Sequence, residues 1–191
     1  MNKNLYIISG CNGAGKTTAS YTVFPEILKC KEFVNADEIA KGLSPFNLES
    51  VAIEAGRIML LRIEDLLNRD ETFSIETTLT TKSYINLVRK AQSKGYSVHL
   101  VFFWLETPEL AIQRVAERVS KGRHNIPLDV IQRRYVGGIN NLFNIFMKEV
   151  DVWTIYDNSS NPRVFVAKGG KNIDFKIYSE TTFNKIKSYV K

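Results

Sequence analysis

The sequence predicts an α/β fold with three layers, in which helices cover both faces of a mainly parallel central sheet. Apolar, strand-like runs alternate with longer segments of helical periodicity along most of the 191 residues. This alternation is typical of parallel strands joined by right-handed crossovers. A glycine-rich pattern, G-x-x-x-x-G-K-S/T, also separates the first apolar run from the first helical segment. Because a chain of this length buries one substantial core, we expect a single domain over residues 1–191.

Each expected strand is a short apolar run that ends at polar or turn residues. The expected core strands are 5–8, 32–35 with its end at Ala36-Asp37, 73–75, 96–105 and 152–156. The run 96–105 is the most apolar of them, as expected for a buried parallel strand. After residue 159, two shorter strands (163–167 and 173–178) flank the turn Gly169-Gly170, and a small terminal helix follows. We therefore expect a core over about 4–159 and an extension over about 160–191.

The expected helices are recognised by their periodicity and by the residues at their ends. They span 16–24, 48–68, 83–94, 108–119 and 128–148. Pro25 ends the first helix, Asn47 caps the second, and Gly95 suits the left-handed cap of the third. Thr107-Pro108 begins the fourth, because a hydroxyl caps and proline fits the first helical position. We expect Gly137-Gly138 to interrupt the fifth helix.

The glycine-rich pattern predicts a loop that binds the phosphates of a nucleoside triphosphate. The residues to which we assign nucleotide binding are Gly10, Cys11, Asn12, Gly13, Ala14, Gly15, Lys16, Thr17 and Thr18. The glycines let several backbone N–H groups converge on phosphate oxygens at the start of a helix. Lys16 is placed to contact the β- and γ-phosphates, and the Thr17 hydroxyl is placed to ligate Mg²⁺. The expected cofactors are ATP, with GTP as an alternative, and Mg²⁺.

Composition narrows the class of protein and its compartment. No apolar run approaches the roughly 20 residues needed to span a bilayer, and the chain begins without a signal peptide. Cys11 and Cys30 form neither a disulfide framework nor a metal-site spacing, which fits a reducing compartment. We therefore expect a cytoplasmic protein with no membrane partner. The formal net charge of +6 admits nucleic acid or phosphate-rich small molecules as ligands.

Two carboxylates follow predicted strands and should face the same crevice as the phosphate loop. Asp37 comes after the second strand and Glu76 after the third, and ligands of such sheets bind at the carboxyl ends of the strands. Phosphoryl transfer needs a carboxylate that accepts the proton of the attacking hydroxyl. We assign this role to Asp37, with Glu76 as a ligand of the acceptor. The alternatives are a helix-cap role for Asp37, a salt bridge for Glu76, or water-mediated Mg²⁺ binding by both.

The segment 114–134 is expected to form a helical lid over the nucleotide. It holds six basic residues and two acidic ones, Glu117 and Asp129. The basic residues are Arg114, Arg118, Lys121, Arg123, Arg133 and Arg134. The cluster lacks the interleaved aromatic side chains of a single-strand binding platform, so we favour contact with nucleotide phosphate over nucleic acid. One of its arginines would act on the γ-phosphate.

Together these motifs resemble the zeta-toxin family of P-loop kinases over roughly residues 4–159. The resemblance rests on the phosphate loop and on the segments 34–38, 75–79, 114–127, 133–135 and 156–159. It implies a kinase with Asp37 as the base, Lys16 and Thr17 at the phosphates and Mg²⁺, and an arginine among Arg118, Arg133 and Arg134 at the γ-phosphate. We take Arg118 and Arg134 as the catalytic arginines. The residues that we expect to bind the acceptor are Asn35, Glu76, Thr77 and Thr78.

The family resemblance also implies an acceptor and a partner. Known members phosphorylate the 3′-hydroxyl of the aminosugar in UDP-N-acetylglucosamine, so a sugar nucleotide is the expected acceptor and an antitoxin a candidate partner. Two alternatives stay open from the sequence. The basic charge also suits a kinase of nucleic-acid ends, which would bind single strands with a steep salt dependence. A nucleotide-gated binding protein without kinase activity would use the same phosphate loop as a switch.

Overall fold

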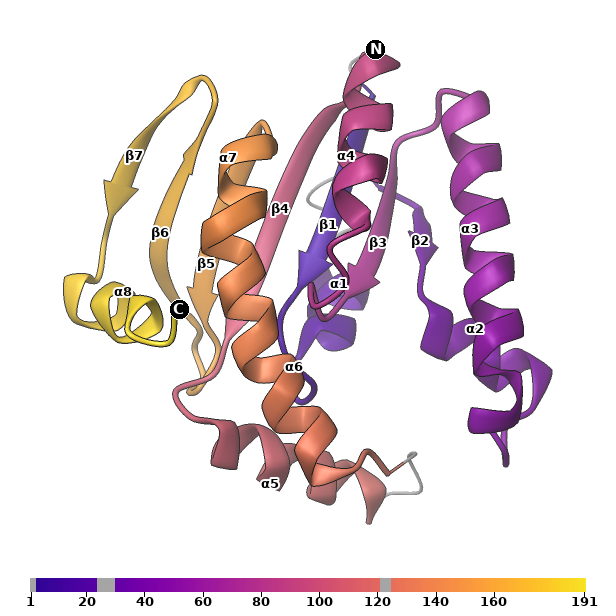
Figure 1. The fold of residues 1–191 in the computed structure, drawn as a ribbon, viewed down its shortest axis with the longest axis horizontal. Coiled ribbons are helices and arrows are strands. Elements are labelled where there is room, and N and C mark those ends of the chain that lie inside the picture. Colours follow the sequence, from indigo (N-terminus) through magenta and orange to yellow (C-terminus); the bar gives the residue numbers. More distant parts are fainter. Residues whose placement is uncertain (1–2, 24–29, 121–124) are drawn as a thin grey trace.

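Seven strands form one sheet in the order β2-β3-β1-β4-β5-β6-β7 (Figure 1). The structure is a computed structural model, and it describes residues 3–23, 30–120 and 125–191. The strands are β1 Asn4–Ser9, β2 Glu32–Val34, β3 Phe73–Thr77, β4 Ser97–Trp104, β5 Val152–Asp157, β6 Val164–Gly170 and β7 Ile173–Ile177. β1 to β5 pair in parallel, whereas β6 and β7 are antiparallel. The predicted fold class is confirmed.

Helices connect the parallel strands and lie on both faces of the sheet, with α4 and α6 in front and α1 behind in Figure 1. Their bounds are α1 Lys16–Val23, α2 Ala36–Leu43, α3 Ala52–Asn68, α4 Tyr84–Ser93, α5 Pro108–Val119, α6 Leu128–Asn141, α7 Met147–Glu149 and α8 Glu180–Lys187. A 3₁₀ turn, Glu49–Val51, precedes α3, and a π-helical segment, Leu142–Phe146, joins α6 to α7. The residues Phe24 and Pro25, where we expected α1 to end, lie outside the described residues. No described helix combines the length and the apolarity that crossing a membrane requires.

The core is centred on the middle strands and extends into the C-terminal elements. Leu5, Ile7 and Ile8 of β1 have no exposed surface, as expected for a parallel strand covered on both faces. The same hydrophobic cluster includes Val166 of β6 and Ile186 of α8. The extension after residue 159 therefore completes the edge of the sheet and shares its core.

Most of the predicted helix ends are confirmed. Gly95 follows α4 with φ +82°, and the Thr107 hydroxyl accepts a hydrogen bond from Leu110 N at 3.1 Å at the start of α5. Asn47 Oδ1 accepts from Ser50 N at 3.4 Å, ahead of the 3₁₀ turn that leads into α3. Local capping chemistry thus set these boundaries, as the sequence predicted.

One helix was missed in the sequence. The second strand ends at Val34, and the next residues form α2 instead of continuing the strand into Ala36-Asp37. Asn35 is extended, and its side chain accepts a hydrogen bond from Asp37 N at 2.8 Å. An asparagine at this position is a strong N-cap. Asp37 therefore lies in the first turn of a helix.

The expected interruption at Gly137-Gly138 is wrong, since α6 continues through both glycines. A Cβ atom at Gly138 would lie 2.6 Å from the carbonyl oxygen of Thr78, and one at Gly137 would lie 3.2 Å from the Thr80 methyl carbon. The glycines allow α6 to pack closely against the loop that follows β3. The glycine pair in the sequence therefore indicates close packing of α6 and not a break in the helix.

Candidate active site

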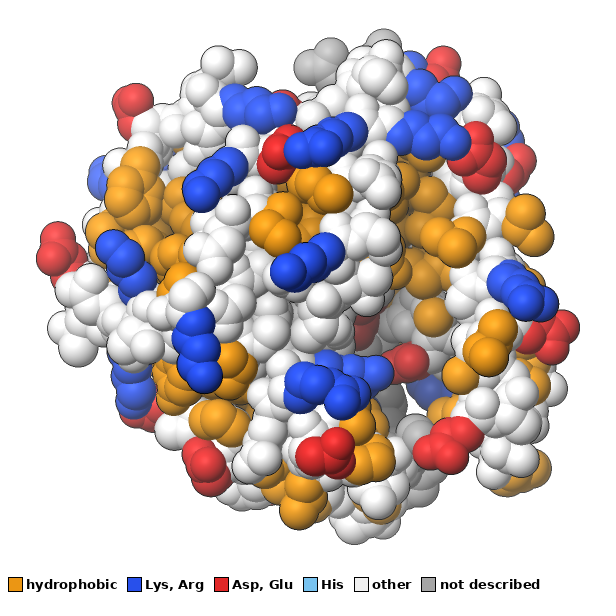
Figure 2. All heavy atoms as spheres, in the orientation of Figure 1, with side chains coloured by type: hydrophobic (Ala, Val, Ile, Leu, Met, Phe, Trp, Pro, Cys, Tyr) orange, Lys and Arg blue, Asp and Glu red, His pale blue; other side chains and the backbone are white. Residues whose placement is uncertain are grey.

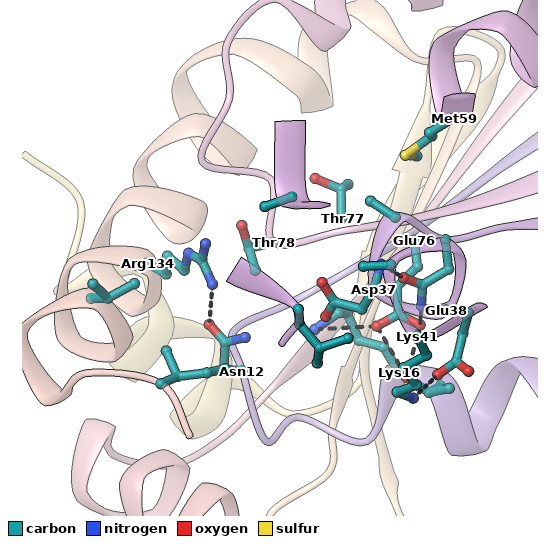
Figure 3. A pocket seen from close by; sticks show the side chains of 18 of the residues that line it. Asn12, Lys16, Asp37, Glu38, Lys41, Met59, Glu76, Thr77, Thr78 and Arg134 are labelled. Atoms are coloured by element: carbon teal, nitrogen blue, oxygen red, sulfur yellow. Dashed lines mark hydrogen bonds and ion pairs between the residues drawn. The ribbon is translucent and has the colours of Figure 1, made fainter. Parts of the chain in front are cut away.

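A cavity of about 550 Å³ lies at the carboxyl edge of the parallel strands (Figure 3). Its walls come from the phosphate loop, the start of α2, the end of β3, and the facing parts of α3, α5 and α6. Elements distant in the sequence meet here because parallel strands place the loops that follow them at one edge. Of the predicted site residues, those that line the cavity are Asn12, Lys16, Thr17, Asn35, Asp37, Glu76, Thr77, Thr78, Arg118 and Arg134.

The phosphate loop needs glycine at several of its positions. Gly10, Gly13 and Gly15 have φ values of +138°, +81° and +80°, which side chains with a Cβ atom rarely adopt. A Cβ atom at Gly10 would lie 2.2 Å from the Phe103 carbonyl oxygen, and one at Gly15 would lie 2.5 Å from Asn158 Nδ2. The loop is therefore wrapped as tightly as a phosphate-binding loop requires.

The loop is braced from the end of β5 by a residue to which we gave no role. Asn158 Nδ2 donates to the carbonyl oxygen of Ala14 at 2.8 Å, and Asn158 N donates to Trp104 O at 2.9 Å. Arg114 donates to the carbonyl oxygens of Asn158 and Ser159, each at 2.8 Å. The sequence could have indicated a site role for Asn158, because this residue directly follows a core strand.

Thr17, Asn35 and Lys16 surround the carboxylate of Glu76. Thr17 Oγ1 donates to it, at 2.9 Å from Oε2 and 3.1 Å from Oε1, and Asn35 Nδ2 donates to Oε2 at 2.9 Å. Lys16 Nζ donates to Cys11 O at 2.9 Å and lies 3.7 Å from Glu76 Oε1. Glu76 is only 10% exposed, so this carboxylate is fixed against the phosphate loop. The Thr17 hydroxyl and the Glu76 carboxylate together offer the hard oxygen donors that could hold Mg²⁺.

Asp37 differs from Glu76 in its exposure to solvent. It lies in the first turn of α2, its side chain is exposed, and it lines the cavity. Asn35 thus has two tasks, since its Oδ1 caps the helix that carries Asp37 and its Nδ2 holds Glu76. Figure 3 shows both carboxylates near Lys16, on the opposite side of the cavity from Arg134.

The loop after β3 is held in a strained conformation. Leu79 is fully buried with φ +62°, a region that is costly for a side chain branched beyond Cβ. Asn141 Nδ2 donates to the carbonyl oxygens of Leu79 and Thr80 at 2.8 and 3.0 Å. Thr77 Oγ1 accepts from Leu79 N at 3.1 Å, and the Thr78 hydroxyl lies 2.9 Å from that of Thr80. These contacts orient Thr77 and Thr78 at the cavity wall.

Only some of the arginines of segment 114–134 face the cavity. Arg118 and Arg134 line it, and Arg134 Nη1 donates to Asn12 Oδ1 at 3.2 Å. Arg118 Nε is buried, and no described atom accepts its hydrogen bond. Arg114 instead bonds to the carbonyl oxygens after β5, and Arg133 is exposed outside the cavity. Residues 121–124, including Arg123, belong to the predicted lid but lie outside the described residues.

The remaining loop side chains have different surroundings. Burial raises the pKa of the Cys11 thiol from its ordinary value of 9.0 to about 11, so the thiol is neutral and poorly nucleophilic at neutral pH. Thr18 is exposed on α1 and does not line the cavity. Lys41 and Glu38, which sequence reasoning did not single out, form an ion pair on the α2 wall.

Comparison with solved structures identifies similar folds. The crystal structure of the AvrRxo1-ORF1:AvrRxo1-ORF2 complex with sulphate ions matches with a TM-score of 0.80 and 17% identity, over 98% of this chain and 64% of that one. A structure from the PezAT chromosomal toxin-antitoxin system of Streptococcus pneumoniae matches with a TM-score of 0.69 and 18% identity, over 98% of this chain and 84% of that one. At these identities the likeness establishes the fold. The chain spans less than two thirds of the AvrRxo1 chain.

Sequence comparison identifies the family. An uncharacterized protein of Haemophilus influenzae is 29% identical over 126 residues, which cover 66% of this chain and 88% of that protein. The family model described as Zeta toxin matches residues 1–169, which include the phosphate loop, both carboxylates and the arginines of α5 and α6. The chain belongs to the Zeta toxin family.

Proposed function

We propose that the protein is a Mg²⁺-dependent and ATP-dependent kinase that phosphorylates a hydroxyl group of a small acceptor. A sugar nucleotide such as UDP-N-acetylglucosamine is the first acceptor to test. One observation carries the proposal: a phosphate loop and the exposed carboxylate of Asp37 line the same cavity. A nucleotide switch needs the loop but has no use for a free carboxylate at this place.

The proposed phosphoryl transfer needs three groups: the γ-phosphate of ATP, the hydroxyl of the acceptor and the Asp37 carboxylate. The acceptor oxygen attacks the γ-phosphorus of ATP and forms a new O–P bond, while the bond between that phosphorus and the bridging β,γ-oxygen breaks. The hydroxyl proton passes to the Asp37 carboxylate, and ADP leaves. Because most of the catalysis in such reactions is positioning and charge neutralisation, the remaining residues act by holding the reactants.

Lys16, Thr17 and Glu76 form the phosphate end of the site. The Lys16 ammonium group, which now donates to Cys11 O, would turn to the β- and γ-phosphates. The hydroxyl of Thr17 and the adjacent carboxylate of Glu76 are hard oxygen donors, and such a pair with waters fits Mg²⁺. When bound, Mg²⁺ would neutralise charge on the phosphates. Glu76 therefore has a place beside the metal as well as the acceptor role that we predicted.

Arg118 and Arg134 are proposed to contact the γ-phosphate from the opposite wall. Both line the cavity, and the buried Nε of Arg118 has no acceptor among the described residues. The acceptor would lie between them and α2, with Asn35, Thr77 and Thr78 as its hydrogen-bonding partners. In this arrangement the charge that develops on the transferred group lies between cations, which stabilises the transition state.

The comparisons support the nucleotide and suggest a partner. A crystal structure of the AvrRxo1 pair with ATP has a TM-score of 0.76 to this chain, at 18% identity. PezAT is described as a toxin-antitoxin system. We therefore propose ATP as the phosphoryl donor, with GTP as the competitor to test, and an antitoxin as a candidate binding partner.

The test is γ-phosphate transfer from labelled ATP with Mg²⁺. The acceptor panel contains UDP-N-acetylglucosamine, other sugar nucleotides and 5′-hydroxyl oligonucleotides, and each assay is repeated with Asp37→Asn. Labelling of a sugar nucleotide that disappears in the variant supports the proposal. Labelling of oligonucleotides alone would make the protein a nucleic-acid-end kinase. ATP binding without transfer to any acceptor would favour the switch.

A further inference from the structure

An apolar groove of about 630 Å³ lies between α3 and α4. Figure 2 shows hydrophobic side chains gathered between these helices, beside the hollow that contains charged side chains. The aliphatic side chains of the groove are Ile53, Leu60, Ile63, Leu67 and Leu87. Ile53 and Leu60 are 76% and 61% exposed. Apolar surface in a concave site favours an apolar ligand, because binding removes that surface from water.

The groove continues from the candidate active site. The two cavities share four lining residues: Ala36, Met59, Thr81 and Tyr84. The boundary is formed by Tyr84, whose hydroxyl lies 3.9 Å from the sulfur of Met59. Figure 3 shows Met59 on the far side of the cavity from Asn12 and Arg134, beyond Thr77. The two cavities therefore adjoin, and a ligand with its hydroxyl at Asp37 would reach the groove at this boundary, beside Met59 and Tyr84.

Polar contacts close the groove at its other end. Lys90 of α4 pairs with Glu64 of α3, and Lys94 Nζ donates to Asn68 Oδ1 at 3.1 Å. At 1.5 Å per residue, the stretch of α4 from Tyr84 to Lys90 is about 9 Å long. A docked partner helix needs several turns of open groove. A space of this length that opens at the active site instead suits one substituent of a small molecule.

The α3 side of the groove contains a glycine that the backbone does not require. Gly56 lies in the interior of α3, and its φ is not positive. Glycine is unfavourable there relative to alanine. A Cβ atom at this position would meet no described atom within 4 Å, so neither strain nor close packing excludes a side chain. The missing side chain keeps the groove open.

We propose that the groove binds an acyl chain carried by the phosphate acceptor. The inference rests on the proposed kinase function and defines its substrate class, an acceptor with a polar, hydroxyl-bearing part and an aliphatic extension. The polar part lies among Asp37, Asn35 and Thr77, and the chain passes Met59 into the space above Gly56. The side chains that line the groove are mainly aliphatic, which favours an aliphatic chain over a planar ring system that would stack on aromatic side chains.

The experiment uses UDP-glucosamine derivatives that differ only in their N-acyl group: acetyl, hexanoyl and decanoyl. Their dissociation constants are measured by calorimetry with a non-hydrolysable ATP analogue and Mg²⁺ present, and kcat/KM is measured with ATP. Each methylene that becomes buried tightens binding by up to about fourfold. Because the groove is open on one side, we expect roughly tenfold tighter binding and higher kcat/KM for hexanoyl than for acetyl.

Two matched variants test the location. Gly56→Leu fills the groove, and we expect it to abolish the gain from chain length while changing acetyl binding by less than about threefold. Gly42→Leu makes the same change at an exposed glycine of α2, which also has free space and lines neither cavity. It should keep the full gain. Circular dichroism and thermal melting of both variants show that each remains folded.

The outcomes separate this proposal from the proposed function. Equal binding of all three compounds, failure of any to bind, or a gain that survives Gly56→Leu overturns it, and a protein segment then becomes the occupant to test. Tighter binding of the longer chains that Gly56→Leu removes supports it. If that binding pattern occurs without phosphoryl transfer, the kinase assignment fails while the assignment of the groove stands.

Discussion

Two parts of the cavity are built in different ways: the proposed nucleotide half, with Asn12, Lys16 and Thr17, and the proposed acceptor half, with Asn35, Asp37, Thr77 and Thr78. In the nucleotide half, Asn12 and Lys16 are each only 7% exposed, and the three loop glycines have backbone conformations that few other residues adopt. In the acceptor half, Asp37 is exposed. Backbone geometry therefore defines the proposed nucleotide site, whereas side chains from the start of α2 and the end of β3 would define the proposed acceptor site. A sequence motif can describe the first but not the second.

The largest expected effect isolates chemistry from nucleotide binding. Asp37→Asn removes the proposed proton acceptor, and we expect the rate of phosphoryl transfer to fall by about 10²- to 10⁴-fold. The affinity for ATP, measured by calorimetry, should change by less than about threefold, because Asp37 is not part of the phosphate loop.

The control for this variant is Asp129→Asn. Asp129 is also an exposed aspartate in the first turn of a helix, α6, and lies outside the cavity. It controls for the loss of a favourable interaction with the helix dipole. Equal transfer rates in Asp37→Asn and wild type would remove Asp37 from the mechanism.

The next effect concerns the nucleotide half alone. Lys16→Met removes the buried ammonium group, and we expect the dissociation constant for ATP to rise by roughly 10- to 100-fold, because charge-assisted hydrogen bonds to phosphate are lost. Binding of the acceptor without nucleotide should be nearly unchanged. If acceptor binding weakens equally, the two halves are not separable, and the comparison between them fails.

A third effect tests how α6 supports the acceptor half. Gly138→Ala would bring a Cβ atom to 2.6 Å from the Thr78 carbonyl oxygen, and such overpacking costs about 1–3 kcal/mol. We expect lower stability in urea unfolding and a raised KM for the acceptor, with ATP affinity retained, because Thr78 and the adjacent end of β3 must move.

Gly42→Ala is the matched comparison for that variant. Gly42 is also helical, but a Cβ atom there meets no described atom within 4 Å. Alanine should therefore stabilise the protein by about 0.5–1 kcal/mol through helix propensity. If both variants changed the free energy of unfolding in the same direction, the packing of Gly138 against Thr78 would not constrain the chain after β3.

The sequence predicted what local chemistry controls. Thr107-Pro108 and Gly95 set helix ends in the way that capping requires, and the phosphate loop was complete within one short segment. The sequence did not predict Asn158 as the brace of that loop, because this contact joins residues 144 positions apart. It gave the wrong reason for Gly137-Gly138, since a break and a close approach produce the same dipeptide. It also missed α2, because Asn35, the residue that caps this helix, was assigned to the end of the preceding short strand.

The smallest effect concerns the exclusion of water from the nucleotide half. Burial raises the pKa of Cys11 from 9.0 to about 11, so the folded protein keeps the thiol neutral where the unfolded chain ionises. This contribution to stability is complete below pH 9 and is lost as the pH rises toward 11. At pH 10 the loss should be about 1.4 kcal/mol, one pKa unit of difference.

Urea unfolding of wild type and Cys11→Ala at pH 8 and pH 10 measures it, since alanine has no proton to lose. The stability of the wild type should fall relative to the variant between these pH values. Cys30→Ala is the matched comparison, because it removes the other thiol whose pKa burial raises and leaves Cys11 in place. If wild type and Cys11→Ala lose the same stability, water reaches the interior of the phosphate loop, and the nucleotide half is less closed than its backbone conformation indicates.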